Sequence, residues 1–203
     1  MMKHEHTLEQ VQDLIHELGN IGIGSAGTSL SVLLDTQVKT TTLKAEPIDS
    51  DMKLDATKMK EQVVGILFPY DKDIQGFALF LLEKDFVDEL LMKLINKKCD
   101  FKDMDKESSS LLQEITGIMI SSYLSGISLA TNANVRIQLP TVTLDMRGSI
   151  INDALSFLLL QDKEALWLDH EFQLDTCPAV NHLLFMLSKE SIERIFASLE
   201  VKR

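Results

Sequence analysis

The chain has 203 residues, of which 45% are hydrophobic and 25% are charged, and its formal net charge at pH 7 is −11. This length and hydrophobic content allow one substantial core, and the negative charge argues against binding to the phosphate backbone of nucleic acids. No apolar run is long enough to span a bilayer, and no N-terminal apolar segment resembles a signal peptide. We therefore expect a cytoplasmic protein without membrane insertion.

The N-terminal region predicts a long amphipathic helix from Thr7 to Leu34. Apolar residues recur there at three- and four-residue steps, which is the spacing of one helix face. Thr7 and Gln10 form a capping-box pattern at its start. The G-x-G-x-x-G run from Gly22 to Gly27 would indicate a dinucleotide-binding loop only if a strand preceded it. Because the preceding pattern is helical, the helix is the better interpretation.

The outer face of this helix combines small and polar residues. The outward positions are Asp13, Glu17, Asn20, Gly24, Gly27 and Ser31, whereas the spacing turns Ile21 inward. Glycine in a helix interior costs about 0.5–1 kcal/mol relative to alanine, so the glycines suggest that another surface approaches this face closely. Glu17 and Asn20 lie three residues apart and could enter one concave site together. The alternative is that both are ordinary solvated residues.

Shorter elements follow in the first half of the chain. The patterns predict a strand at Gln37–Leu43, a polar loop at Glu46–Glu61, strands at Val63–Phe68 and Gly76–Leu82, a helix at Asp85–Asn96 and a charged linker at Lys97–Lys106. The two strands before the helix are joined by a turn that begins at Pro69.

The second half echoes the first. A helical pattern runs from Asp105 to Ala130, and Ser110, Glu114 and Ser121 each lie 97 positions after Asp13, Glu17 and Gly24. Self-similarity of this kind indicates a duplicated unit. We expect one domain over residues 1–203, made of two intertwined repeats at about 7–97 and 105–200, with pseudo-two-fold symmetry.

The remaining elements complete the fold class. Strands are expected at Val135–Asp145, interrupted at Pro140, and at Ala154–Leu160, Ala165–Leu168 and His182–Leu187, before a last helix at Lys189–Leu199. Each repeat then consists of a helix, several strands and a helix. The sequence therefore predicts an α+β fold with a largely antiparallel sheet flanked by helices.

The pattern Asp/Ser-x-x-x-Glu-x-x-Asn, present twice, resembles that of the CheC, CheX and FliY phosphatases of bacterial chemotaxis. Asp13, Glu17 and Asn20 match it in full, and the residues from Ile21 to Ala26 look like the family's usual continuation. Length and duplication favour the CheC branch over the shorter CheX branch, and no additional domain of the FliY kind is visible. The resemblance spans nearly the whole chain.

The resemblance implies a hydrolase of two-component signalling that acts on the aspartyl phosphate of the response regulator CheY. It implies that Glu17 engages a lysine of the receiver domain and that Asn20 holds the attacking water in line with phosphorus. The required Mg²⁺ would belong to the receiver, so no metal or cofactor of the chain's own is expected. Gly24 would be a docking position. Asp13 could dock as well, or only favour the helix dipole.

The second copy of the pattern is incomplete. Ser110 and Glu114 match, but Gly117 stands where the amide should be, and glycine has no side chain that could hold a water. This surface could have weak activity or none, serve as a binding face, or be merely solvated. A second function therefore stays open, a non-catalytic adaptor that binds a receiver domain or the deamidase CheD.

Other chemistry has little support in the sequence. His4 and His6 could clip a metal, but solvated histidines near a chain end are the more common case. Cys99 and Cys177 are more simply buried thiols than a disulfide. The chain contains no Gly-x-Ser-x-Gly elbow and no Cys-x-x-Cys pair, which argues against the common nucleophilic hydrolases and against zinc.

Overall fold

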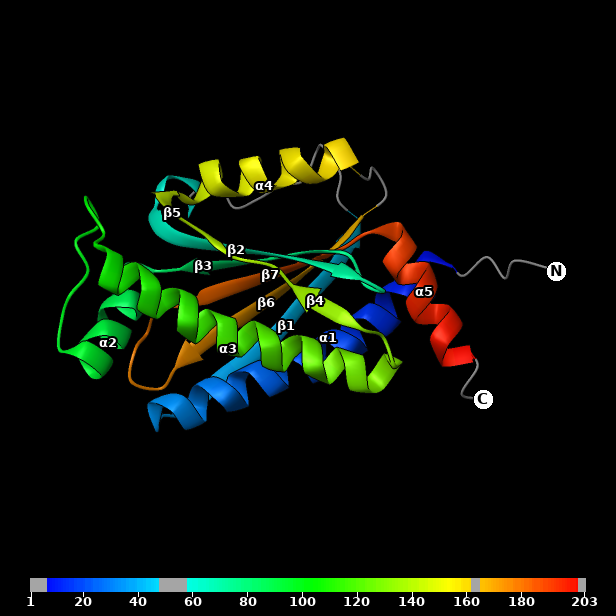
Figure 1. Ribbon diagram of the computed structural model, residues 1–203, viewed down its shortest axis with the longest axis horizontal. Helices are drawn as coiled ribbons and strands as arrows, with labels where there is room; N and C mark the ends of the chain where they lie inside the picture. The colour runs from blue at the N-terminus through cyan, green and yellow to red at the C-terminus, as the bar shows by residue number, and fades with distance from the viewer. Residues whose placement is uncertain (1–6, 48–57, 162–164, 201–203) are drawn as a thin grey trace.

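A mixed sheet-and-helix architecture is seen in the computed structural model, which describes residues 7–47, 58–161 and 165–200 (Figure 1). Within these residues a seven-stranded sheet has the order β1-β6-β7-β3-β2-β4, and β5 also pairs with β2. The strands are β1 (Val38–Pro47), β2 (Gln62–Lys72), β3 (Gly76–Leu82), β4 (Val135–Ile137), β5 (Thr141–Met146), β6 (Leu166–Leu174) and β7 (Asn181–Leu187). All pairings are antiparallel, which confirms the predicted α+β class.

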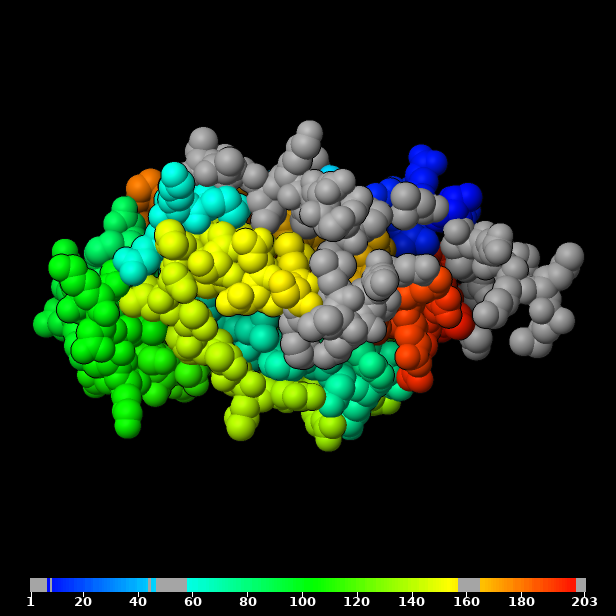
Figure 2. Space-filling model, turned by 90° about the horizontal axis from the view of Figure 1, so that it is seen from above, coloured from blue at the N-terminus to red at the C-terminus, as the bar shows by residue number. Residues whose placement is uncertain are grey.

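Helices cover both faces of the sheet. They are α1 (Leu8–Leu34), α2 (Lys84–Ile95), α3 (Lys106–Thr131), α4 (Arg147–Gln161) and α5 (Lys189–Glu200), with a 3₁₀ turn, η1, at Lys58–Lys60. Figure 1 shows α1 and α3 on one side of the sheet and α4 on the other. Seen from the α4 side, this helix lies across the sheet next to β5 (Figure 2).

The sheet joins the two halves of the chain. β1, from the first half, pairs with β6, whereas β5, from the second half, pairs with β2. The central pair β3 and β7 also comes from different halves. Such an exchange is the arrangement expected for intertwined repeats in one domain; the repeat boundaries and the symmetry stay predictions.

The strand predicted at Ala154–Leu160 is wrong, because this segment belongs to helix α4. A short apolar run does not distinguish a buried strand from a buried helix. In the structure the buried side chains of this segment follow a helical period, since Ile150, Ile151 and Ala154 all face the sheet. The predicted strand therefore covered only the second half of a helix that begins at Arg147.

Several predicted boundaries also change. β1 continues to Pro47, into the segment expected to be a polar loop, and β2 continues past Phe68 to Lys72. Pro69 fits inside β2 because it lies opposite the gap between β4 and β5, where no ladder partner needs its missing N–H. The loop residues 48–57 lie outside the described residues.

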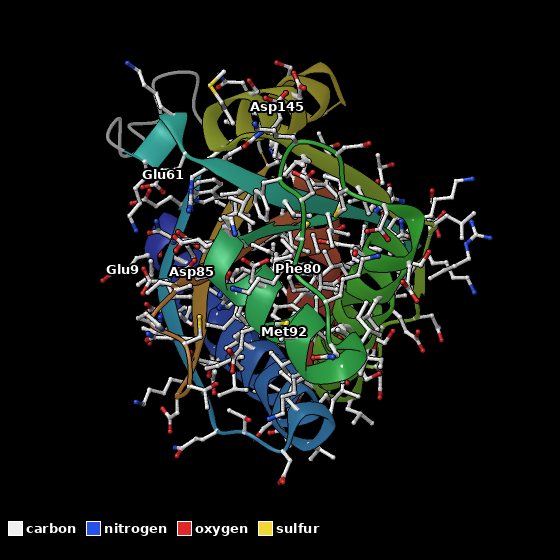
Figure 3. All side chains as sticks on the ribbon, turned by 90° about the vertical axis from the view of Figure 1, so that its left-hand side faces the viewer. Glu9, Glu61, Phe80, Asp85, Met92 and Asp145 are labelled. Atoms are coloured by element: carbon white, nitrogen blue, oxygen red, sulfur yellow. The ribbon has the colours of Figure 1, made fainter. Side chains whose placement is uncertain are left out.

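The core has a part on each face of the sheet. Between the sheet and α1, α2, α3 and α5, buried aromatic rings stack edge to face, as Phe80 and Phe172 do with ring centroids 6.2 Å apart. Figure 3 shows Phe80 at the centre of the molecule. A smaller cluster that includes Trp167 and Ile150 lies beneath α4. In the part of the chain that the structure describes, no helix is long and apolar enough to cross a membrane.

Candidate functional site

Helix α1 presents the predicted site residues to solvent. Its start is fixed by the predicted capping box, in which Thr7 N–H donates to Gln10 Oε1 (3.0 Å) and Gln10 N–H donates to Thr7 Oγ1 (3.3 Å). Asp13, Glu17 and Asn20 are exposed. Neither carboxylate has a hydrogen-bond or ion-pair partner among the described residues. The helical spacing therefore placed these side chains outward correctly, and their roles stay predictions.

Gly24 is exposed one turn after Asn20. A Cβ atom built on Gly24 meets nothing within 4 Å, so no contact among the described residues requires a glycine there. Helix propensity alone would favour alanine at this position. The bare outer side of Gly24 thus agrees with a surface that another molecule approaches closely.

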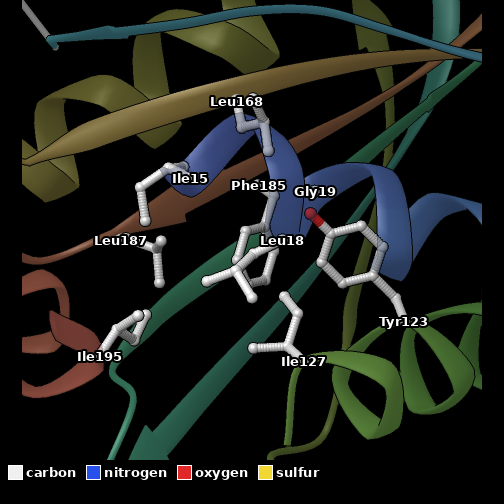
Figure 4. Close-up of a pocket in the computed structure, with 9 residues that line it drawn as sticks. All are labelled: Ile15, Leu18, Gly19, Tyr123, Ile127, Leu168, Phe185, Leu187 and Ile195. Atoms are coloured by element: carbon white, nitrogen blue, oxygen red, sulfur yellow. The ribbon is translucent and has the colours of Figure 1, made fainter. Parts of the chain in front are cut away.

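On the inner side of α1, Gly19 and Gly22 pack directly against side chains of other elements. A Cβ atom on Gly22 would lie 2.7 Å from the ring of Tyr123, and one on Gly19 would lie 2.2 Å from Leu168 Cδ2. Figure 4 shows Tyr123, Leu168 and Phe185 beside Gly19, around a small apolar cavity of about 10 Å³. This cavity is too small for a ligand.

Two residues of α1 face differently from the prediction. Gly27 is buried, and a Cβ atom on it would lie 2.7 Å from Thr40 Cγ2, because β1 packs beside this half of the helix. Ile21 is not turned inward. Its side chain is 42% exposed and lies beside α3, near Gly126. Ser31 is half-buried, and its hydroxyl donates to the carbonyl oxygen of Thr36.

An open groove runs between α1 and α3, next to the predicted site. It is lined from α1 by Asn20, Ile21, Gly24, Ser25, Thr28 and Ser29, and from α3 by Ser121, Ser122, Ser125, Gly126 and Leu129. Small side chains let the two helices approach, and the hydroxyl oxygens of Ser29 and Ser122 lie 2.6 Å apart. Leu129 is 81% exposed. Asn20 therefore lies at the edge of a shallow groove with an exposed leucine on its other wall.

The amide of Asn20 has a neighbour that the sequence reasoning missed. Asn20 Nδ2 lies 3.3 Å from Nδ1 of His16, which is half-buried one turn earlier on α1. The spacing of four residues places two side chains together on a helix, and this signal could have identified His16. Leu129 could not have been found in this way, because it comes from another helix.

A buried histidine lies beneath this part of α1. His170 Nε2 is 2.8 Å from the hydroxyl of Tyr123, and His170 Nδ1 is 3.0 Å from Thr42 Oγ1. Burial and, to a smaller extent, the nearby His16 lower the pKa of His170 to about 3. Burial also raises the pKa of Tyr123. At neutral pH the polar groups beneath the site are therefore uncharged and hydrogen-bonded.

The second predicted surface lies on α3. Ser110 and Glu114 are exposed, and Gly117 is half-buried. A Cβ atom built on Gly117 meets only Phe68 Cε1, at 4.0 Å. Crowding around the Cβ position therefore does not require a glycine there.

The remaining candidates give no site. His4 and His6 lie outside the described residues, and no group of three or more metal-binding side chains occurs within them. Cys99 and Cys177 are buried free thiols, as predicted, and burial raises the pKa of both.

Known proteins resemble this chain in sequence and in fold. A family model described as the CheC-like family matches residues 11–42, which contain the exposed face of α1. The CheY-P phosphatase CheC of Bacillus subtilis is 26% identical over 202 residues, which cover 94% of each chain.

Solved structures show the same fold. FliY of Thermotoga maritima has a TM-score of 0.70 at 20% identity, over 98% of this chain and 100% of that one. A chain of the FliG–FliM complex of H. pylori has a TM-score of 0.62 at 10% identity, over 93% of this chain and 99% of that one. The family match and the relative that is similar along 94% of its length confirm the resemblance to the CheC-like family drawn from Asp13, Glu17 and Asn20.

Proposed function

We propose that this protein is a phosphatase that hydrolyses the aspartyl phosphate of a CheY-type response regulator. The observation that carries the proposal is an exposed carboxylate and an exposed amide, Glu17 and Asn20, three residues apart on α1 and next to the bare side of Gly24. The likeness to a relative named as a CheY-P phosphatase, which extends along almost the whole chain, supports it.

Asn20 is proposed to orient the attacking water. Phosphoryl transfer depends on positioning and charge stabilisation, with little covalent chemistry for the catalyst. A carboxamide suits this task because its oxygen can accept a hydrogen bond from water while its nitrogen donates to a phosphoryl oxygen. The Mg²⁺ that neutralises the phosphoryl group would be held by the receiver domain, so this chain would contribute no metal.

Glu17 is proposed to dock the partner by pairing with a lysine of the receiver. Both Glu17 and Asn20 would then enter the phosphorylated pocket from one side of α1. Gly24 would let the receiver approach the helix backbone, and the exposed side chains of Ile21 (42%) and Leu129 (81%) would add apolar contact. Asp13 would extend this contact by one turn.

The net charge of −11 gives no general attraction toward an acidic receiver. Binding would therefore depend on these local contacts.

A second candidate function is a non-catalytic adaptor that binds a receiver domain or CheD. The observation that favours it is the Ser110 and Glu114 surface, which keeps an exposed acid but has Gly117 in place of an amide. The occurrence of the same fold in a FliG–FliM complex is compatible with a role in protein assembly.

The test is to mix the purified protein with phosphorylated CheY and Mg²⁺ and to follow the loss of the phosphoryl group. We expect the parent protein to accelerate the loss and Asn20→Ala to remove the acceleration, on the order of 100-fold, because the water is no longer positioned. Binding of the receiver by Asn20→Ala should be largely unchanged. Glu17→Gln should instead weaken binding.

Glu9→Gln is a matched control, since it removes an exposed acid from the first turn of α1, away from the pair. An Asn20→Ala protein as fast as the parent would contradict the catalytic mechanism. A parent protein that binds the receiver but never accelerates phosphate loss would favour the adaptor function.

A further inference from the structure

We propose that His16 is a positioning residue that fixes the orientation of the Asn20 amide. This inference rests on the proposed phosphatase function. The two side chains lie four residues apart on α1, with Asn20 Nδ2 3.3 Å from His16 Nδ1. An amide nitrogen can only donate a hydrogen bond. His16 Nδ1 is therefore the acceptor, and the ring carries its proton on Nε2.

The surroundings hold His16 more firmly than Asn20. The imidazole is half-buried, whereas Asn20 is exposed. His170, which lies near His16, is itself fixed by hydrogen bonds to Tyr123 and Thr42. A half-buried ring next to this hydrogen-bonded group has less rotational freedom than a side chain in solvent, so it can serve as a fixed point for the amide.

The hydrogen bond decides which atom of Asn20 is available to a partner. It occupies one N–H of the amide and turns Oδ1 away from His16. Oδ1 is then free to accept from the attacking water, while the second N–H can donate to a phosphoryl oxygen. Without His16 the carboxamide would rotate freely, and part of its population would present the wrong atom to the water.

This role makes a specific kinetic prediction. Loss of the hydrogen bond should lower kcat about three- to tenfold, the effect expected for one neutral hydrogen bond. KM should change little, because Glu17, Gly24 and Leu129 do not depend on this contact.

The experiment compares His16→Gln with His16→Lys in the assay with phosphorylated CheY. Both replacements are unbranched and favour helix, but glutamine supplies an acceptor oxygen to the residue four positions later, whereas lysine can only donate. We expect His16→Gln to keep kcat within about twofold and His16→Lys to show the loss. His16→Ala should behave like His16→Lys.

Binding of the receiver by each position-16 variant should match that of the parent protein, because the positioned amide acts on the water and not on docking. Lysine at position 16 with parental kcat, or a loss confined to receiver binding, would overturn the positioning role. If Asn20→Ala itself has no effect, the proposed function fails instead.

A spectroscopic readout does not require the partner. Nuclear magnetic resonance of the free protein should show the His16 proton on Nε2 and a shift of the Asn20 amide protons in His16→Lys but little shift in His16→Gln. A ring proton on Nδ1 in the parent protein would also overturn the proposal.

Discussion

At the scale of single residues, Gly22 and Gly24 lie two positions apart on α1 and have opposite surroundings. A Cβ atom on Gly22 would lie 2.7 Å from the Tyr123 ring, whereas one on Gly24 would enter open space. Internal packing therefore accounts for Gly22, whereas no contact among the described residues accounts for Gly24. Substitutions at the two positions can therefore test folding and the proposed docking separately.

Gly24→Ala should stabilise the free protein by about 0.5–1 kcal/mol, because alanine is the better helix former and its methyl group meets no neighbour. The same variant should lower phosphatase activity, since the methyl group would meet the receiver. Gly22→Ala is the matched control and should destabilise the fold through overlap with Tyr123. Urea unfolding and the phosphatase assay measure both effects; a fully active Gly24→Ala protein would contradict the docking role.

The periodicity of α1 predicted most of its faces but not all. Glu17 and Asn20 were placed outward correctly, because a period of 3.6 residues fixes which side chains lie opposite the apolar stripe. Gly27 and Ile21 were placed wrongly, because β1 and α3 cover the two flanks of the helix unequally. A single helix pattern contains no information about what packs on each flank.

At the scale of elements, the order of helices and strands could largely be predicted, and α4 is the exception. Its run from Ala154 to Leu160 is apolar except for Ser156, which hides the period that distinguishes helix from strand. β1 and β6 proved longer than predicted because pairing with each other stabilises polar and mixed segments that have no strong strand pattern of their own. Such pairing joins distant parts of the chain and is invisible to local patterns.

His170 connects three elements, since it lies on β6 and is hydrogen-bonded to Tyr123 on α3 and Thr42 on β1. Its pKa is lowered to about 3 by burial and by His16, compared with about 6.5 in an unfolded chain. As the pH falls below about 6.5, the unfolded state binds the proton first. The stabilisation is therefore complete above this pH and decreases from there down to about pH 3.

We expect the free energy of unfolding of the parent protein to fall between pH 7 and pH 4.5 more steeply than that of His170→Gln. The difference in slope should approach about 1.4 kcal/mol per pH unit, because one histidine stays neutral in the folded state. Urea unfolding at a series of pH values measures it, and the carboxylates common to both proteins cancel in the comparison. If the free energy of unfolding depended on pH with the same slope in both proteins, the folded state would not keep His170 neutral.

At the scale of the whole molecule, the packing of α1 against α3 contains two equivalent contacts. Ser25 lies beside Gly126, and Ser29 lies beside Ser122. Ser122 lies 97 positions after Ser25, and Gly126 lies 97 positions after Ser29. Exchanging the two helices therefore turns one contact into the other, and the offset is the one found between the two sequence patterns. Asn20 and Gly117 then occupy corresponding positions on α1 and α3, so the molecule would offer two comparable surfaces of which one lacks the amide.

This correspondence leads to the prediction that Gly117→Asn creates a second active surface. The position has room, since only Phe68 Cε1 comes within 4.0 Å of an added Cβ atom, and Glu114 is already exposed one turn earlier. In the Asn20→Ala protein, where the first site is inactive, Gly117→Asn should restore measurable loss of phosphate from phosphorylated CheY. Gly117→Ala is the control, because it removes the glycine without adding an amide.

Restoration by asparagine but not by alanine would show that positioning of one amide beside one acid is sufficient on this scaffold. If neither variant restores activity although both bind the receiver, α3 must differ from α1 in more than the missing side chain. Position 16 is not expected to be that difference, because the position 97 residues later is occupied by Gln113, whose side chain is half-buried like that of His16. Glutamine can accept from an amide four residues later, so the pair Gln113 and Gly117→Asn should reproduce the geometry of His16 and Asn20.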